Sequence, residues 1–267
     1  MKKVFLTGAS SGIGLAIAKA LIARGDEVWG TSRNLIRLEP LMGIHPVRLD
    51  LNDPRSIDDA FKCALAEAGN FEVVINNAGS GHFGPAEILS EGEIQKQFQT
   101  LFFSHLHLMR IALTAMRNRE NGLIINITSL ASRLPVPFMA AYNAAKAAMA
   151  SFTMSIQLEL PDSNVRIVDL QPADINTAFN DAIPKDDGAN PRYNARVAKT
   201  WEAVDRNMKN APKPELVAEH VLRIIDSTNP PPRVTVGDFF QTKIAPMIFR
   251  FLPQRVRLWG LKMYYGI

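Results

Sequence analysis

Short apolar stretches alternate with longer segments in which apolar residues recur at helical spacing along most of the 267-residue chain. The apolar stretches are rich in Val, Ile and Leu and do not alternate with polar residues, as is typical of strands buried on both faces. Strands that alternate with helices indicate a parallel sheet built from βαβ units. The pattern predicts seven strands, at residues 4–7, 27–31, 46–50, 73–76, 123–128, 166–171 and 233–236.

Several predicted helices have recognisable ends. The first spans residues 12–25 and stops at a glycine, and another begins at the N-cap Asp53 with Pro54 in its first turn. The sequence Ser90-Glu91-Gly92-Glu93 has the form of a capping box, which starts a further helix. No repeat, low-complexity tract or linker divides the chain. We therefore predict a single α/β domain over residues 1–267, a Rossmann-like, doubly wound, parallel seven-stranded sheet with helices on both faces.

Residues 178–213 form the least regular stretch and are rich in Pro, Asn and Asp. They follow the sixth predicted strand and so start at the carboxyl edge of the sheet, where ligands bind in open α/β folds. We expect this segment to be a substrate loop. Phe138, Met139 and Phe179 are candidates for an apolar pocket wall, although ordinary core packing is the simpler explanation for each.

Composition limits the class of protein. Hydrophobic residues make up 47% and charged residues 21%, enough apolar material for a sizeable core. No signal peptide or stretch of about 20 apolar residues is found, and the single cysteine, Cys63, fits a reducing compartment, so we expect a cytoplasmic protein. The apolar helical neighbours of Cys63 favour a core position. A net charge of +4 is too diffuse to indicate nucleic-acid binding, and no histidines share i, i+4 spacing, so no metal site is expected.

A glycine-rich turn lies between the first predicted strand and the helix after it. Gly8, Gly12 and Gly14 suit a tight turn, close approach of the backbone to phosphates, and close packing of helix on strand. The helix N-terminus at such a turn attracts a pyrophosphate. The turn therefore indicates a dinucleotide cofactor.

The end of the second predicted strand bears on which cofactor is used. An acidic residue here marks a preference for NAD because it binds the ribose diol, but the sequence reads Thr31-Ser32-Arg33-Asn34. Arg33 can pair with a 2′-phosphate instead. A solvated surface arginine is the alternative. We expect NADP, with NAD less favoured.

Tyr142 and Lys146 lie one helical turn apart, so their side chains share a face. An ammonium beside a phenol favours phenolate and lowers the pKa of the tyrosine, which then serves as proton donor and acceptor. Ser129 ends a predicted strand thirteen residues before Tyr142, and a second turn, Asn76-Asn77-Ala78-Gly79, follows the fourth strand. A Tyr-x-x-x-Lys pair alone recurs by chance, but this order and spacing favour proton transfer beside a nicotinamide.

Over residues 3–237 these motifs resemble the short-chain dehydrogenase/reductase family, of the single-domain kind. The resemblance implies that Tyr142 is the general acid/base, that Ser129 binds the substrate oxygen, and that Lys146 holds the nicotinamide ribose while lowering the tyrosine pKa. It implies NADP(H)-dependent interconversion of a small-molecule carbonyl and alcohol, and the candidate pocket wall makes an apolar substrate our expectation. The matching motifs are Thr7-Gly8-Ala9-Ser10-Ser11-Gly12-Ile13-Gly14, Asn76-Asn77-Ala78-Gly79, Ser129 and Tyr142-Asn143-Ala144-Ala145-Lys146.

The same resemblance implies a larger cofactor site. Asp50 matches an adenine contact, Thr177 a contact to the nicotinamide amide, and Arg33 a basic residue associated with NADP. Family members pair through helices that flank the sheet, which implies a homodimer or homotetramer. The implied cofactor residues are Gly8, Ser10, Ser11, Gly12, Ile13, Gly14, Arg33, Asp50, Leu51, Asn77, Ala78, Gly79, Tyr142, Lys146, Pro172, Ile175 and Thr177.

The chain departs from the family pattern at two places. Leu101 stands where an asparagine that holds a proton-relay water is usual, and Ser104 stands where glycine is usual. Leucine has neither donor nor acceptor, so either Ser104 anchors the relay or turnover is slow. Ala173 replaces a glycine after Pro172, where the loop can still close. Because the catalytic group is present, we expect activity to survive.

Residues 239–267 form a basic, aromatic-rich tail with five Lys or Arg and no Asp or Glu. Such an amphipathic stretch can lie on a membrane surface, pack on the core, cover the substrate cleft or meet a partner subunit. We favour packing against the protein over membrane contact.

Two other functions stay open. One is an NAD-linked alcohol dehydrogenase, against which Arg33 and the missing carboxylate argue. The other is a catalytically slow redox sensor that binds NADP and changes partners, for which Leu101 is the only motivation.

Overall fold

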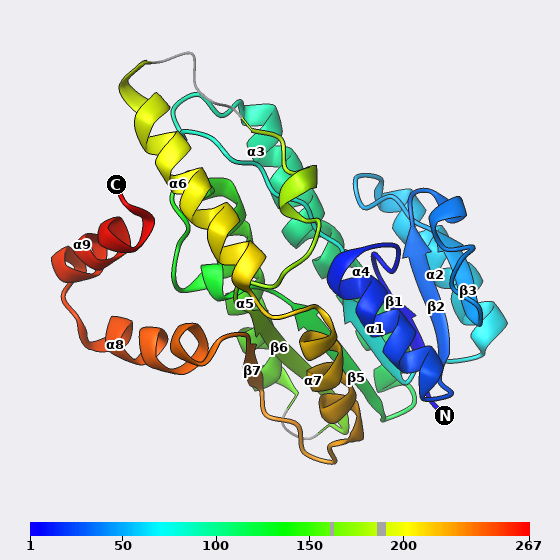
Figure 1. The fold of residues 1–267 in the computed structure, drawn as a ribbon. Helices are drawn as coiled ribbons and strands as arrows, with labels where there is room; N and C mark the ends of the chain where they lie inside the picture. The colour runs from blue at the N-terminus through cyan, green and yellow to red at the C-terminus, as the bar shows by residue number, and fades with distance from the viewer. Residues whose placement is uncertain (161–162, 186–190) are drawn as a thin grey trace.

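The computed structural model describes residues 1–160, 163–185 and 191–267, with only the backbone of 191–194. Its strands form one parallel seven-stranded sheet in the order β3-β2-β1-β4-β5-β6-β7, which confirms the predicted doubly wound fold (Figure 1). The strand order reverses between β1 and β4, the point at which ligands bind in such sheets. The strands are β1 Lys3–Leu6, β2 Glu27–Ser32, β3 Ile44–Arg48, β4 Val73–Asn76, β5 Gly122–Ile127, β6 Val165–Pro172 and β7 Arg233–Val236.

Helices cover both faces of the sheet, and alternate residues of one strand serve two separate cores (Figure 1). Val4 and Leu6 of β1 pack with α1 and α7, whereas Phe5 packs with α2, α4 and α5. Burial on both sides explains the unbroken apolar runs of the sequence. The helices are α1 Gly12–Ala23, α2 Pro54–Ala68, α3 Glu91–Phe98, α4 Ser104–Arg117, α5 Ala140–Glu159, α6 Pro191–Asn210, α7 Glu215–Asp226, α8 Ala245–Phe251 and α9 Gln254–Tyr265.

The predicted helix ends follow the expected chemistry. The carboxylate of Asp53 accepts a hydrogen bond from the Arg55 N–H at 2.9 Å, and Gly69 ends α2 with φ of 76°. The Ser90 hydroxyl accepts from the Glu93 N–H at 3.2 Å, so the capping interaction starts α3. These side chains satisfy N–H groups that the first turn of a helix leaves unpaired.

The third strand begins two residues earlier than predicted, at Ile44, and ends at Arg48. Pro46 lies inside the strand, paired with Gly30, and not at its start. A proline fits there because β3 is an edge strand, where a missing N–H costs no ladder bond. Asp50 therefore lies in the loop after the strand, not at its end.

The description of 178–213 as irregular is wrong for most of that segment. A short 3₁₀ turn, Asn180–Ala182, precedes the long helix α6, while residues 186–190 of the segment lie outside the described residues. Among the described side chains of α6, Val197, Thr200 and Ala203 are buried. The segment is polar overall, and its Pro, Asn and Asp residues are typical of a loop. The helix crosses above the carboxyl edge of the sheet (Figure 1).

Two burial predictions are also wrong. Cys63 is exposed on α2, on the side of the helix away from its apolar stripe. The tail does not pack broadly on the protein: α8 has no buried residue, and Tyr265 is the one buried residue of α9. Across the described residues, no helix is both long enough and apolar enough to cross a membrane.

Candidate active site

The predicted catalytic residues come together at the carboxyl ends of β5 and β6. Ser129 lies two residues beyond β5, and its hydroxyl hydrogen-bonds to the phenol of Tyr142 on α5. Lys146, one turn further along α5, is only 4% exposed. Its Nζ lies 5.9 Å from the centroid of the Tyr142 ring and donates to the Ile127 carbonyl at 2.8 Å. The phenol, the hydroxyl and the ammonium therefore lie close together at this edge of the sheet.

The pKa of Tyr142 is raised, contrary to the sequence-based expectation. Burial disfavours the phenolate, and this effect outweighs the hydrogen bond from Ser129, while the nearby Asp174 carboxylate adds to the rise. Lys146 is itself affected by burial, which lowers the pKa of its amine to about 8. In this structure Lys146 does not lower the pKa of Tyr142 below its ordinary value. The Nζ of the lysine donates to a backbone carbonyl.

A buried carboxylate lies behind Lys146. Asp169 on β6 is 1% exposed and accepts hydrogen bonds from the Thr128 hydroxyl, from Gln171 Nε2 at 2.7 Å and from Arg233 Nε at 2.9 Å. Its charge partly opposes the desolvation of Lys146 and favours the ammonium form. Sequence reasoning missed Asp169, although an acidic residue inside an apolar strand is a recognisable signal.

The glycine turn has the shape that close approach of a phosphate requires. Gly8 and Gly12 have φ of 70° and 53°, a region that favours glycine. A methyl group at Gly14 would collide with the Gly8 carbonyl oxygen. Asn77 braces the turn from below, because its Nδ2 donates to the Thr7 carbonyl at 2.9 Å and to that of Gly8 at 3.3 Å.

The N-terminus of α1 is open to an anion. Its N-cap residue, Ser11, makes no side-chain capping bond, and the first turn contains no acidic residue. A helix end with free N–H groups and no competing carboxylate attracts phosphate. The turn and the helix together fit a dinucleotide.

The other predicted cofactor residues differ in how their side chains lie relative to this turn. Gly12 faces Thr177, since a methyl group on the glycine would lie 3.6 Å from the threonine Cβ. Arg33 is exposed, two residues beyond Thr31, whose carbonyl accepts from the Ala9 N–H at 2.9 Å. Asp50 accepts from the Asn52 N–H at 3.0 Å and shapes its own loop.

Other members of the predicted set offer the cofactor mainly backbone. The side chains of Leu51 and Ile175 are buried in the two main cores, and Pro172 ends β6. Ser10 and Ile13 are half-buried in the turn itself. The remaining members, Ala78 and Gly79, continue the Asn77 turn, where the Ala78 N–H donates to the Thr7 hydroxyl at 3.0 Å.

Leu101 occupies a buried, apolar position beside Lys146. It is fully buried in a π-helical turn, Gln99–Phe103, between α3 and α4. A methyl group at Gly79 would lie 3.0 Å from Leu101 Cδ2 and 3.9 Å from Lys146 Nζ. Ser104 does not replace the missing amide, because its hydroxyl donates to the Leu51 carbonyl and accepts from Gln99 Nε2 at 3.0 Å. The alternative in which Ser104 anchors a relay is therefore unsupported.

His105 is a polar neighbour that sequence reasoning did not single out. It is 1% exposed, and burial together with the positive charge of Lys146 lowers the pKa of its imidazole to about 3. The neutral ring hydrogen-bonds to the backbone of Ala78, and its Nε2 has no partner among the described residues. Nothing in the sequence distinguishes it from the other helical histidines.

Apolar side chains enclose the tyrosine. Phe83, Met139, Ile183 and Val197 form a buried cluster against which Phe138, Phe179 and Trp201 pack. The ring centroids of Tyr142 and Phe179 lie 6.0 Å apart. The predicted pocket wall of Phe138, Met139 and Phe179 therefore lies beside the phenol.

Phe138 has a strained backbone. Its φ of 61° is unusual for a bulky residue, and such strain often accompanies function. The side chain of Asn143 holds the loop by accepting from the Val136 N–H at 3.3 Å and donating to the Val136 carbonyl at 2.8 Å. The loop is thus fixed by the helix that carries Tyr142.

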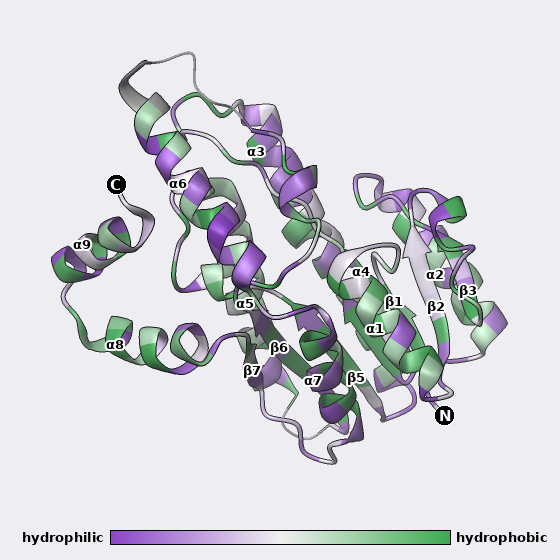
Figure 2. Cartoon of the chain, viewed as in Figure 1, coloured by the Kyte–Doolittle hydropathy of each residue, from purple (hydrophilic) through white to green (hydrophobic). Residues whose placement is uncertain are grey.

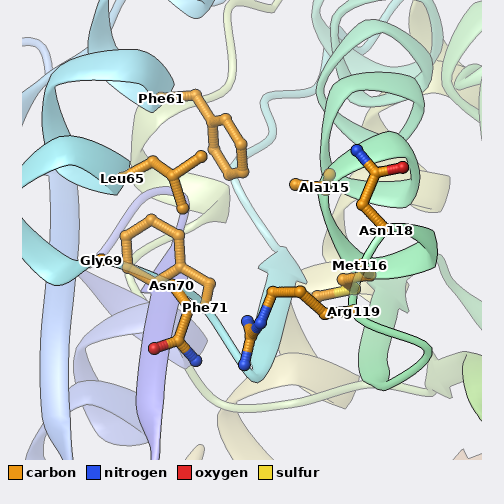
Figure 3. Close-up of a pocket in the computed structure, with 10 residues that line it drawn as sticks. Phe61, Leu65, Gly69, Asn70, Phe71, Ala115, Met116, Asn118 and Arg119 are labelled. Atoms are coloured by element: carbon orange, nitrogen blue, oxygen red, sulfur yellow. The ribbon is translucent and has the colours of Figure 1, made fainter.

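A separate hollow of about 200 Å³ lies between α2 and the end of α4 (Figure 3). Phe61, Leu65, Phe71 and Met116 line it together with Arg119. Phe71 and Arg119 precede β4 and β5, so the hollow lies at the amino ends of these strands, on the edge opposite Tyr142. It is not part of the candidate site.

Comparison with known proteins gives consistent matches. Residues 2–188 match the short chain dehydrogenase family. The 3-ketodihydrosphingosine reductase of Bacteroides thetaiotaomicron is 30% identical over 269 aligned positions, which cover 99% of this chain and 98% of that protein. A short-chain dehydrogenase from Streptomyces avermitilis is 28% identical with a TM-score of 0.82, over 98% of this chain and 93% of that one. An alcohol dehydrogenase from Thermococcus sibiricus, complexed with 5-hydroxy-NADP, is 25% identical with a TM-score of 0.73, over 90% and 97%.

Proposed function

This chain belongs to the short-chain dehydrogenase/reductase family, and we propose that it is an NADP(H)-dependent carbonyl reductase for ketones with a long apolar part. Membership makes it an NAD(P)-dependent oxidoreductase acting on CH–OH and C=O groups, which replaces the redox-sensor alternative. The observation that carries the proposal is the Tyr142 phenol, bonded to Ser129 and enclosed by apolar side chains.

The chain's own residues supply the proton and the oxygen-binding groups. When bound, a nicotinamide cofactor exchanges hydride with the carbonyl carbon. Tyr142 donates its proton to the carbonyl oxygen during reduction, and Ser129 donates a hydrogen bond where negative charge develops, typically worth a few kcal/mol. Because burial raises the pKa of Tyr142, the phenol is protonated and ready to donate at neutral pH. The ammonium of Lys146 opposes the cost of the tyrosinate that remains.

Two observations support an apolar substrate. The wall beside Tyr142 consists of aromatic and aliphatic side chains. The relative from Bacteroides thetaiotaomicron, which matches almost the whole chain, bears the name 3-ketodihydrosphingosine reductase. A lipid-like ketone agrees with both. We assign 178–213, including the described part of α6, as the substrate-covering segment of one domain over residues 1–267.

The first experiment follows NADPH oxidation with a series of methyl ketones of increasing chain length. We expect kcat/KM to rise with chain length and Tyr142→Phe to lower kcat by about 10²–10⁴-fold. The urea-unfolding midpoint of the variant should match that of the wild type, which shows that the fold is retained. Turnover that survives in Tyr142→Phe would show that Tyr142 is not the general acid.

The preference for NADP rests on Arg33, which is exposed beyond β2 with no carboxylate in the Thr31–Asn34 turn sequence. The alcohol dehydrogenase from Thermococcus sibiricus, complexed with an NADP derivative, supports it. Arg33→Gln should weaken NADPH binding by at least tenfold and leave NADH binding unchanged. Equal loss for both cofactors, or tighter NADH binding by the wild type, favours the NAD-linked alternative.

Self-association is the remaining part of the proposal. Phe103, Met154 and Leu158 are 50%, 50% and 77% exposed along the outer side of α5 and the turn before α4. Exposed apolar side chains on flanking helices suit a homodimer or homotetramer built through these helices. Leu158→Glu should yield monomers by light scattering, whereas an unchanged mass places the interface elsewhere.

A further inference from the structure

The tail formed by residues 239–267 leaves a large apolar surface uncovered. Each of its exposed large hydrophobic side chains keeps at least 39% of its surface accessible. Figure 2 shows hydrophobic residues along α8 and α9, which stand apart from the main body of the chain in this view. These side chains are Phe239, Phe240, Met247, Ile248, Phe251, Val256, Leu258, Trp259, Met263 and Tyr264.

The exposed residues of α9 are arranged in stripes. Val256, Trp259 and Met263 follow i, i+3, i+7 spacing and so share one face. Arg255 and Lys262, seven residues apart, flank that face. An apolar stripe beside a row of cations is the pattern of a helix that lies in a membrane interface.

The segment before α9 repeats this arrangement. Met247 and Phe251 are one helical turn apart on α8, and both are exposed. Lys243 and Arg250, again seven residues apart, are also exposed. Two successive helices therefore carry the same combination of apolar and basic residues.

The charge of the tail indicates which kind of partner covers its apolar surface. The tail carries five Lys or Arg and no Asp or Glu. If two copies packed these faces together about a two-fold axis, each would present the same cations to the other. Like charges held together at an interface repel, whereas an anionic lipid surface attracts each of them.

We propose that residues 239–267 dock this protein onto the surface of an anionic lipid bilayer. The aromatic and aliphatic side chains enter the boundary between headgroups and acyl chains, and the Lys and Arg side chains contact anionic headgroups. The tail lies on the membrane and does not span it. This inference does not depend on which ketone is reduced.

The two tail helices are held as one unit. The Arg257 Nε donates to the Leu252 carbonyl at 2.7 Å, and its Nη2 donates to the Arg250 carbonyl at 3.1 Å. Its guanidinium also lies 5.2 Å from the Phe249 ring centroid. Arg257 thus caps the end of α8 from within α9, which fixes the angle between the two faces.

Hydrogen bonds also tie the tail to the candidate site. Gln241 Nε2 donates to the Asp174 carboxylate at 2.6 Å and to the Tyr264 hydroxyl at 3.1 Å. The same hydroxyl accepts from Asn207 of α6 at 2.9 Å. Asp174 lies between Pro172 and Thr177 of the proposed cofactor site, so a docked tail fixes the site relative to the bilayer.

The test uses the full chain and vesicles of phosphatidylcholine with or without 30% phosphatidylglycerol at low salt. We expect flotation with the anionic vesicles and little with the neutral ones. Replacing Arg255 and Lys262 together by Gln should weaken binding about 30-fold, since one basic residue near an anionic surface contributes about fivefold. A matched variant that replaces the exposed Lys19 and Lys62 of α1 and α2 by Gln should bind like the wild type.

Tryptophan fluorescence tests the depth of the tail. Trp259 is 64% exposed, whereas Trp29 is buried in the core and Trp201 is half-buried against Phe83. Brominated lipids in anionic vesicles should quench the wild type but not Trp259→Phe. Turnover of a short water-soluble ketone by each variant should stay within twofold of wild type, which shows that the fold is intact.

Three results would overturn the proposal. One is equal flotation with neutral and anionic vesicles, and another is quenching that persists in Trp259→Phe. The third is a tail variant that changes the molar mass in solution while its vesicle binding is unaltered, because the tail then contacts a second copy of the chain.

Discussion

The lowered pKa of Lys146 predicts that the free energy of unfolding depends on pH, which can be measured without any substrate. Burial lowers the pKa of its amine from 10.5 to about 8 in the folded chain. Between these values the unfolded chain binds a proton that the folded chain does not. Because the unfolded state binds more protons, the free energy of unfolding rises with pH across this window and is lowest below pH 8.

The magnitude follows from the two pKa values. At pH 7.5 the buried amine costs the folded state about 3 kcal/mol, and at pH 9.5 this cost falls to about 1.4 kcal/mol. The wild type should therefore gain about 2 kcal/mol from Lys146 over this range. Lys146→Met removes the titrating group, and it also removes the hydrogen bond to the Ile127 carbonyl. The difference between the two proteins should change by about 2 kcal/mol, whatever its value at pH 7.5.

Urea unfolding at pH 7.5, 8.5 and 9.5 at constant ionic strength provides the assay. Tyrosines of the unfolded chain begin to titrate near the top of this range, but both proteins carry them and their contributions cancel in the difference. Lys19→Met, at an exposed position on α1, serves as the matched control and should show no pH-dependent difference. A wild type minus Lys146→Met difference that is constant within about 0.5 kcal/mol would refute the argument that this amine is desolvated.

Four further substitutions test other residues of the molecule. Leu101→Asn should lower the free energy of unfolding by about 3 kcal/mol, because it buries an amide in an apolar position. The same substitution should leave kcat within about threefold of wild type, and a many-fold rise in kcat would show that the missing relay limits turnover. Gly14→Ala should abolish cofactor binding in titrations, whereas Gly260→Ala, with no atom near its Cβ position, should stabilise α9 by about 0.5–1 kcal/mol in urea unfolding. Asn143→Ala should cost about 1–2 kcal/mol and raise the ketone KM, because both bonds to Val136 are lost; an unchanged KM separates this loop from substrate binding.

The parts of the fold that the sequence predicted well share a physical reason. Buried parallel strands need continuous apolar residues, so six of the seven predicted strands agree with the observed ones within one residue at each end, and the edge strand β3 within two. Turns that require left-handed glycine or a side-chain cap are equally visible, as Gly8 and Asp53 show. The motif order then predicted that Ser129, Tyr142 and Lys146 would meet, because strand ends and helix starts converge at one edge of such a sheet.

The features that the sequence did not reveal depend on three-dimensional neighbours. The pKa of Tyr142 depends on burial by side chains far away in the sequence, which no local pattern reports. His105 acquires its low pKa because α4 buries the imidazole and places it near Lys146. The exposure of the tail likewise depends on how little of α8 and α9 is buried against the rest of the chain. The spacing of apolar residues in the sequence does not report this.

The two departures from the family pattern differ in how the surrounding structure accommodates them. At Ala173 the extra methyl group is matched by Gly237, whose φ is 149° and whose Cβ, if present, would lie 2.7 Å from that of the alanine. The space lost at one residue is recovered at another on the adjoining strand end. At Leu101 neither the leucine nor Ser104 takes the place of the amide, because Ser104 is bound elsewhere and the site beside Gly79 is filled by the leucine itself. A proton relay to Lys146 through the side chains of residues 101 and 104 is therefore closed in this structure, and reprotonation of the buried Tyr142 phenol must use other groups.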